Sequence, residues 1–502
     1  MITFLILLGA IAILAWGFIR VRPYGKLGIL AWLQSVVLIT PWLIFFGLFA
    51  AGIYINLAGV LALVLVSAGF YIYLGRQLRS LGADELAAKR ASSFTAEENQ
   101  TLESPSSSHS GRSDSGAGRS ELSEAQEPAF TSIPAEDLAQ VEGIFGIDTF
   151  FRTETIPYQE GAIFKGNLRG EPEATAARLG EVLAERLGDR YRLFLLEGPE
   201  DRPVVIVLPS SADPPKATTP QKVLCVVLAI ATLVTCLETS GILLGFDFSQ
   251  ELNRWPEVLP LALGILATLV VHEFGHFFQA QRYGIQTSPP FFLPAWQIGS
   301  FGALTRFESL LPNRTALFDI AFTGPAAGGL LSLGMLLLGL VLSHPGSLFQ
   351  IPAGFFQGSI LVGSLARIIL GSAVQKALVD INPLVLIGWL GLVINAINLM
   401  PAGQLDGGRV VQAVYGRKIA GRTTIITLIV LALVSFVNPL ALYWAVLILF
   451  LQRNLERPCL NDLSEPDDAR AALGLLALFL MLATLLPLSP SLAGRLGIGA
   501  AL

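Results

Sequence analysis

Residues 271–276 read Val271-His-Glu-Phe-Gly-His276, and they lie inside a run of apolar residues that begins near Pro256. The run has the length and composition of a membrane-spanning helix. Polar and charged side chains are unfavourable in hydrocarbon, so two histidines and a glutamate inside such a helix indicate a functional site. The alternative is a polar cluster that serves only to pack the helices.

His272 and His276 are four residues apart, so a helix presents both imidazoles on one face, where they can hold one Zn²⁺ ion. Glu273 lies beside them and can act on a water molecule as a general base. A catalytic zinc site usually has three protein ligands and one open position, so a third ligand is expected elsewhere in the chain.

Asp406 is the best candidate for the third ligand. Of the other two histidines, His109 lies in a polar segment. His344 lies at the outer end of a predicted span, on the side of the membrane opposite to the HExxH motif. Asp406 stands near the inner end of a later span, in Asn398-Leu-Met-Pro-Ala-Gly-Gln-Leu-Asp-Gly-Gly, and the charges that flank the spans place it at the depth of the two motif histidines. Two alternatives stay open for Asp406: capping of a helix turn, or an ion pair with Arg409.

The composition is that of a polytopic membrane protein. Mean hydropathy is +0.62 and only 14% of the 502 residues are charged, which excludes an ordinary soluble protein. The formal net charge of −5 argues against nucleic acid as a partner, because phosphate contacts need an excess of lysine and arginine. The three cysteines form no CxxC pair, so no disulfide framework is expected.

Residues 1–80 form a predicted membrane region of three spans, at 2–19, 27–50 and 57–74, each near the roughly 20 residues that a helix needs to cross the hydrocarbon. The first run is interpreted as a retained span, because no basic segment precedes it and no clear cleavage site follows; a cleaved signal peptide is the alternative. The lack of an Arg/Ser-rich transit segment favours a bacterial chain. Basic residues after the first and third spans bring the chain into the cytoplasm.

Residues 81–132, rich in Ser, Glu and Gly, are predicted to be a disordered polar linker.

Residues 133–212 are predicted to be a small cytoplasmic α/β domain. The domain contains no cluster of His, Cys and carboxylates, so a structural or partner-binding role is favoured, with the partner unassigned. Its expected elements are helices at 134–145 and 171–187, an extended segment within 149–166, and a hairpin of strands at 191–196 and 203–208.

Residues 213–455 are predicted to be the intramembrane core. Within it, residues 285–310 are apolar but broken by prolines and glycines, so they are interpreted as a re-entrant loop with extended segments. Residues 382–415 are expected to form a helix that runs inward.

Residues 456–502 contain one more span, whose direction depends on whether 423–437 and 439–451 form a tight hairpin or one bent helix. The expected fold is therefore mainly α, a polytopic membrane protein with about 9–10 transmembrane helices and a re-entrant loop, plus the small α/β domain.

HExxH in one span and Asn398-x-x-Pro-x-x-x-x-Asp406-Gly in a later span resemble the site-2 protease family of intramembrane zinc metalloproteases. The resemblance covers residues 222–451, and Phe322-Thr-Gly-Pro and Gly299-Ser-Phe-Gly-Ala within it are also similar to family members. The family often has a polar residue shortly after the Gly-Pro pair, whereas two alanines and two glycines follow here.

A second set of residues is similar to one branch of the family. Gly166-Asn-Leu-Arg-Gly in the α/β domain, together with Pro401-Ala-Gly-Gln-Leu-Asp-Gly-Gly, is similar to the plastid and cyanobacterial branch named for ethylene-dependent gravitropism deficiency and yellow-green leaves. This resemblance implies a multi-pass protein of a bacterial, specifically cyanobacterial, plasma or thylakoid membrane. The charges that flank the spans predict an active site near the cytoplasmic face.

The resemblance also implies an activity: zinc-dependent hydrolysis of peptide bonds in or near the transmembrane segments of single-span or polytopic membrane proteins, that is, regulated intramembrane proteolysis in the lipid bilayer. In that interpretation His272, His276 and Asp406 hold one Zn²⁺, Glu273 is the general base, and Asn398 donates a hydrogen bond to the oxyanion or the substrate backbone. The alternative for Asn398 is helix packing or hydrogen bonding to backbone groups near Pro401. Two other classes stay open, a membrane metal or proton transporter and a non-catalytic zinc-containing membrane scaffold, because intramembrane His and Asp also line ion pathways.

Overall fold

The computed structural model describes residues 133–158, 160–198, 202–296, 298–452 and 454–499, together with helix α2 (Gly25–Ala50) and a few single positions between 14 and 77. Helix α2 covers the second predicted span. Most of the predicted spans 2–19 and 57–74, and the whole of the predicted linker 81–132 with His109, lie outside the described residues. The chain divides into two compact units, Met1–Ala125 with Val434–Leu440, and Gln126–Leu433 with Ala441–Leu502.

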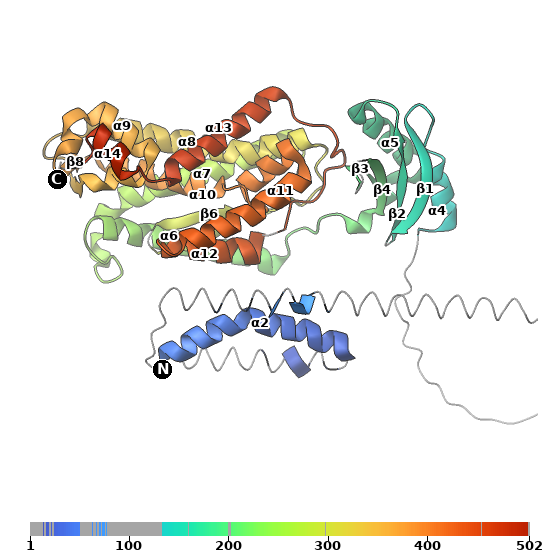
Figure 1. Cartoon of the computed structure of the whole chain (residues 1–502), viewed down its shortest axis with the longest axis horizontal. Coiled ribbons are helices and arrows are strands. Elements are labelled where there is room, and N and C mark those ends of the chain that lie inside the picture. The colour runs from blue at the N-terminus through green and yellow to red at the C-terminus, as the bar shows by residue number, and fades with distance from the viewer. Residues whose placement is uncertain are drawn as a thin grey trace, which may run out of the picture. The chain divides into compact units, whose positions relative to one another are not determined.

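An antiparallel four-stranded sheet in the order β1-β2-β4-β3 forms the centre of the α/β domain (Figure 1). The predicted hairpin is confirmed, because β3 and β4 pair along their whole length, and the predicted extended segment is a second hairpin of β1 and β2. Helix α5 packs against β3 and contributes Leu179 and Leu183 to a core with Phe150 and Phe164. The elements are α4 (Ala135–Glu142), β1 (Phe150–Tyr158), β2 (Gly161–Leu168), α5 (Pro172–Leu187), β3 (Tyr191–Glu197) and β4 (Pro203–Pro209).

Four helices among the described residues are long and apolar enough to cross a membrane. Large apolar side chains remain exposed on their outer faces, for example Ile230 on α6 and Phe479 on α13, which is the surface expected of helices that face lipid rather than water. The protein is therefore a mostly helical, multi-pass membrane protein. The four helices are α6 (Thr219–Leu243), α7 (Trp255–Arg282) with the turn before it from Leu252, α8 (Arg314–Leu342) and α13 (Asp468–Leu485).

The prediction of one helix over 382–415 is wrong. Helix α10 (Pro383–Asn398) ends before Pro401, and a new helix, α11 (Asp406–Val434), begins at Asp406. Proline lacks the amide hydrogen that a continuous helix needs, and Gly403 adopts a φ of +51°, which favours glycine, so the intervening residues form a turn. Asp406 therefore stands at the beginning of a helix and not within one.

The predicted extended segments between the HExxH helix and the next span are confirmed. Strands β5 (Phe291–Ala295) and β6 (Gly299–Leu304) form an antiparallel hairpin that packs on α6.

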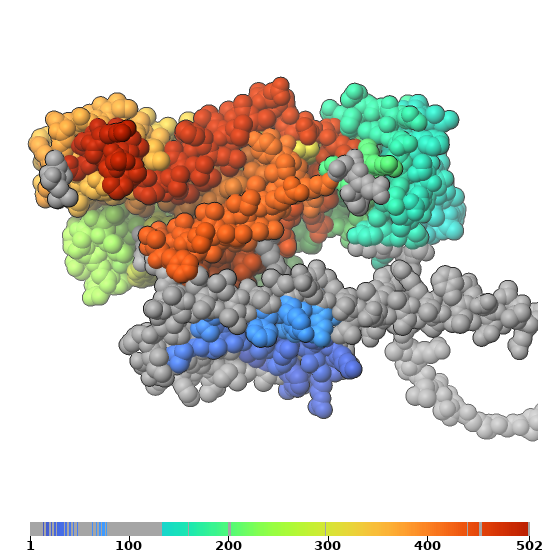
Figure 2. Space-filling view, in the orientation of Figure 1, coloured from blue at the N-terminus to red at the C-terminus, as the bar shows by residue number. Residues whose placement is uncertain are grey.

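Helix α11 ends at Val434 and the next helix begins at Pro439, so residues 423–451 belong to two helices. Figure 2 shows α11 and α13, in orange and red, at the surface of the molecule. The remaining elements are β7 (Phe349–Pro352), α9 (Ile360–Leu370), β8 (Leu378–Ile381), α12 (Pro439–Leu447) and α14 (Pro490–Leu496).

Candidate metal centre

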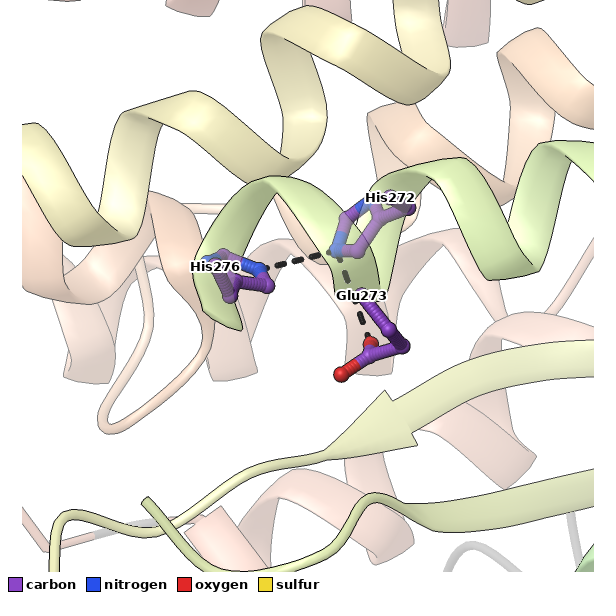
Figure 3. A group of neighbouring side chains, drawn as sticks. All are labelled: His272, Glu273 and His276. Carbon is purple, nitrogen blue, oxygen red and sulfur yellow. Dashed lines mark hydrogen bonds and ion pairs between the residues drawn. The ribbon is translucent and has the colours of Figure 1, made fainter. Parts of the chain in front are cut away.

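The side chains of His272, His276 and Asp406 meet at one point between α7 and the first turn of α11. The Nε2 atoms of the two histidines are 3.0 Å apart. Nε2 of His272 lies 3.1 Å from Oδ2 of Asp406, and Nε2 of His276 lies 3.4 Å from Oδ1. All three residues are buried, with exposed fractions of 5%, 5% and 8%. Figure 3 shows that α7 turns both imidazoles toward each other, with Glu273 beside them.

The far nitrogen of each imidazole is fixed by a hydrogen bond. Nδ1 of His276 donates to the backbone carbonyl of Ile320, at 2.8 Å, and Nδ1 of His272 donates to Oδ1 of Asn395, also at 2.8 Å. The carbonyl of Ile320 can only accept, and the Asn395 amide nitrogen already donates to Gly391, so both protons belong on Nδ1. Both Nε2 lone pairs therefore face the Asp406 carboxylate.

Two imidazole nitrogens and a carboxylate that converge without a donor between them form a site for a cation. This donor set matches the two-histidine and carboxylate ligation of catalytic zinc, and the hydrogen bonds at Nδ1 are the usual supports of metal-binding histidines. The residues present therefore fit one Zn²⁺ ion.

Glycines on two helices make room for the cluster. A methyl group on Gly275, inside the HExxH motif, would stand 2.7 Å from the backbone oxygen of Thr323 on α8, so the missing side chain lets α7 and α8 touch. A methyl group on Gly324 would collide with the imidazole of His276, and one on Gly328 would stand 2.7 Å from Oδ1 of Asn395. The Gly-Pro segment of α8 is thus shaped around the two histidines.

Glu273 lies at the edge of the cluster with its two carboxylate oxygens in different surroundings. Oε2 accepts a hydrogen bond from the Thr305 hydroxyl at 2.8 Å. Oε1 points to the cluster, 3.9 Å from Nε2 of His272. The side chain is 12% exposed and lines a small cavity with Asp406 and Asn398. This is the place of a group that exchanges protons with a molecule held at the cluster.

Arg409 does not pair with Asp406, so that alternative for Asp406 is wrong. The Arg409 guanidinium donates instead to the carboxylate of Glu456, with Nε–Oε2 and Nη2–Oε2 distances of 2.9 and 2.8 Å. Asp406 is left to face the two histidines.

Comparisons with known proteins assign the chain to a family. Residues 260–437 match the family model "Peptidase family M50", and residues 139–215 match "EGY3 middle domain". A protein of Arabidopsis thaliana named "Probable zinc metalloprotease EGY1, chloroplastic" is 36% identical over 73% of this chain and 74% of its own length. The chain belongs to peptidase family M50, in the branch of the EGY zinc metalloproteases.

Other members of this M50 branch show similar likeness. "Probable zinc metalloprotease EGY2, chloroplastic" of Arabidopsis thaliana is 40% identical over 71% of this chain and 65% of its own length. "Probable zinc metalloprotease EGY3, chloroplastic" of Oryza sativa subsp. japonica is 32% identical over 72% of this chain and 66% of its own length. The chain thus spans 65% of the Arabidopsis EGY2 relative. No solved structure matches it.

Asn398, the expected donor to substrate in this M50 family member, is engaged within the protein. Its amide nitrogen donates to the backbone oxygens of Phe301, at 3.2 Å, and Ile394, at 2.9 Å. The first of these bonds ties β6 to α10, and Gly302 stands so close to Asn398 that a side chain there would collide. The role of Asn398 toward substrate stays a prediction.

Three residues that support the cluster were not predicted from the sequence: Asn395, Thr305 and Glu456. Asn395 had a usable signal, since it is a polar residue in an apolar span and precedes Asn398 by almost one helical turn. Its side-chain amide occupies the space beside Gly328, in the segment after Gly-Pro. Thr305 and Glu456 stand outside any motif, and their partners are distant in the sequence.

Proposed function

We propose that this M50 family member is an intramembrane zinc endopeptidase that hydrolyses peptide bonds in or near the transmembrane segments of other membrane proteins. The observation that carries the proposal is the convergence of His272, His276 and Asp406 inside an apolar helix bundle, with the Glu273 carboxylate 3.9 Å from Nε2 of His272. A transport site would need the ligands but not a base beside them.

His272, His276 and Asp406 would hold the zinc ion, which when bound lowers the pKa of a water molecule and polarises a carbonyl. Glu273 takes a proton from the attacking water through Oε1, the oxygen that Thr305 leaves free, and then delivers it to the leaving amine. Burial of the cluster keeps bulk water away from the reacting peptide and strengthens each of these interactions.

Strand β6 would position the substrate. Ala303 and Leu304 of this strand line the same small cavity as Glu273 and His276. A substrate helix must unwind before its peptide carbonyls become accessible, and an unwound segment can add as a strand to a sheet edge. The hydrogen bond from Asn398 to Phe301 would keep this edge aligned with the cluster.

The membrane topology is part of the proposal. Residues 285–310 would re-enter the bilayer as a loop, about 9–10 helices would span it, and the cluster would lie near the cytoplasmic face of a cyanobacterial plasma or thylakoid membrane. The domain order is a three-span region at 1–80, a polar linker at 81–132, the α/β domain at 133–212, the core at 213–455 and a C-terminal span at 456–502. The relatives' printed names support a zinc metalloprotease, and their chloroplastic location supports a thylakoid-type membrane.

The substrate is proposed to be a single-span or polytopic membrane protein. The search for it would compare the membrane proteomes of cells that carry the wild-type chain or Glu273→Gln, with a membrane protein that accumulates in the variant as the candidate. The purified chain would then be reconstituted with that protein as the reporter.

Glu273→Gln is expected to keep about one zinc per chain, because Glu273 is not a ligand, while cleavage of the reporter falls to background. The matched control is Glu257→Gln in the first turn of the same helix, where the carboxylate is half-exposed and pairs with Arg254; it should cleave like wild type. Undiminished cleavage by Glu273→Gln would contradict the mechanism. Zinc movement across liposomes without cleavage by the wild-type chain would favour a transporter instead.

A further inference from the structure

The general base is tied to a loop residue that belongs to none of the motifs. Thr305 directly follows β6, and its hydroxyl donates to Oε2 of Glu273 at 2.8 Å. Residues 273 and 305 come from different elements, α7 and the chain after the β5–β6 hairpin. The contact is therefore produced by the tertiary fold and not by helical spacing.

Thr305 is itself held by a buried ion pair. Its backbone oxygen accepts a hydrogen bond from Nη2 of Arg409 at 2.8 Å. Arg409 is 6% exposed, pairs with Glu456, which is 7% exposed, and lies over the ring of Phe307 at 4.7 Å from the centroid. A buried guanidinium with a carboxylate, a carbonyl and an aromatic ring around it has little freedom to move, so it fixes the position of Thr305.

The same helical turn supports both halves of the site. Asp406 and Arg409 are three residues apart in the first turn of α11, so they project from neighbouring positions of one helix. Asp406 faces the two histidines, whereas Arg409 holds the residue that binds Glu273. The first turn of α11 thus links the third metal ligand to the residue that binds the base, while α7 carries the base and the two histidines.

We propose that Thr305 is a positioning residue for Glu273, fixed by the Arg409–Glu456 pair, which keeps Oε1 of the base directed at the reacting water. This inference rests on the proposed peptidase function. A carboxylate on a flexible side chain has several rotamers, and a hydrogen bond to Oε2 selects the one in which Oε1 faces the cluster. Thr305 would act on the rate of the chemical step and on neither substrate binding nor metal binding.

The test uses the purified full-length chain and the reporter that wild type cleaves. Thr305→Val keeps the shape of the side chain and removes the donor, so we expect kcat to fall by about 10-fold to 100-fold, with KM and zinc content unchanged. Thr305→Ser restores the hydroxyl and should recover most of the rate. The control is Thr484→Val, which removes a buried hydroxyl that donates only to Leu480 within α13; its kcat should equal that of wild type.

The possible outcomes separate the positioning role of Thr305 from the peptidase function. A Thr305→Val enzyme with the kcat of wild type would overturn the positioning role and leave the peptidase function intact. A variant that loses zinc, or that raises KM while kcat is unchanged, would overturn it too, because Thr305 would then support the ligands or the substrate. A wild-type chain that cleaves no membrane protein would overturn the proposed function, and the inference would fall with it.

Discussion

Two buried polar clusters lie next to each other at the beginning of α11, and they are built on opposite principles. The first consists of His272, His276 and Asp406, whose nearest atoms are all acceptors of hydrogen bonds or ligands of a cation. The second consists of Arg409 and Glu456, whose charges compensate each other at 2.8 Å. Gln412 adds a hydrogen bond to the backbone oxygen of Glu456 in the second cluster.

The difference shows how a functional polar cluster can be told from a structural one. Burial is nearly the same in both, so burial does not distinguish them. What distinguishes them is whether the cluster is complete: the ion pair supplies its own cation, whereas the three acceptors need one from outside. Substituting members of each cluster in turn tests this distinction.

The largest effect is expected from Asp406→Ala. Two imidazoles alone leave the site without its negative charge and with one ligand fewer than a catalytic zinc requires. Zinc content, measured by mass spectrometry of the purified chain, should fall from about one per chain to near zero, and cleavage should fall to background. If Asp406→Ala retains zinc, the first cluster is not a three-ligand site.

Glu456→Gln should damage folding and not zinc stoichiometry. Removing one partner of a buried ion pair leaves Arg409 uncompensated, which typically destabilises a protein by about 3–5 kcal/mol. The double variant Arg409→Met/Glu456→Leu removes both charges and should be more stable than Glu456→Gln. Thermal unfolding in detergent would measure the order, and a double variant that is less stable than the single one would contradict the structural reading of this cluster.

Gly324→Ala tests how tightly the first cluster is packed. The added methyl would collide with the imidazole of His276, and a displacement of about 1 Å can reduce a rate by about 100-fold. Gly329→Ala on the same helix meets nothing within 4 Å and serves as the control. Cleavage rates of the two variants should differ by about two orders of magnitude; equal rates would mean that the histidine position tolerates the change.

The smallest effect is expected from Asn395→Leu, which removes the acceptor for Nδ1 of His272. Loss of such a supporting hydrogen bond weakens metal affinity by about 10-fold to 100-fold. Asn395→Asp keeps an acceptor oxygen and should retain more of the affinity. Competition with a zinc chelator measures the change in affinity. A Leu variant with the affinity of wild type would show that Asn395 does not support metal binding.

The sequence predicted those parts of the site that depend on local spacing. His272, Glu273 and His276 share a face because a helix brings positions four apart together, and flanking charges placed Asp406 at the same depth. The break before Asp406 was also readable from Pro401 and Gly403, but the length of the apolar run concealed it. In the α/β domain, two short apolar runs on either side of a polar turn predicted the β3–β4 hairpin correctly.

The rest depends on contacts between distant residues. Glu456 reaches Arg409 across 47 positions, and Thr305 reaches Glu273 across 32. Residues just beyond Glu456 add to the sheet of the α/β domain, where the amide of Leu195 donates to Leu460 and that of Asp462 donates to Leu195. No spacing rule within one segment contains this information, so the supporting residues emerged only from the fold.

X-ray absorption at the zinc edge of the purified wild-type chain tests the metal centre itself. We expect one zinc ion bound by nitrogen and oxygen alone, with two imidazole ligands and distances of about 2.0–2.2 Å. The imidazole signal should disappear in the double variant His272→Ala/His276→Ala. A chain without zinc, or a spectrum dominated by sulfur at about 2.3 Å, would contradict a metal centre built from His272, His276 and Asp406.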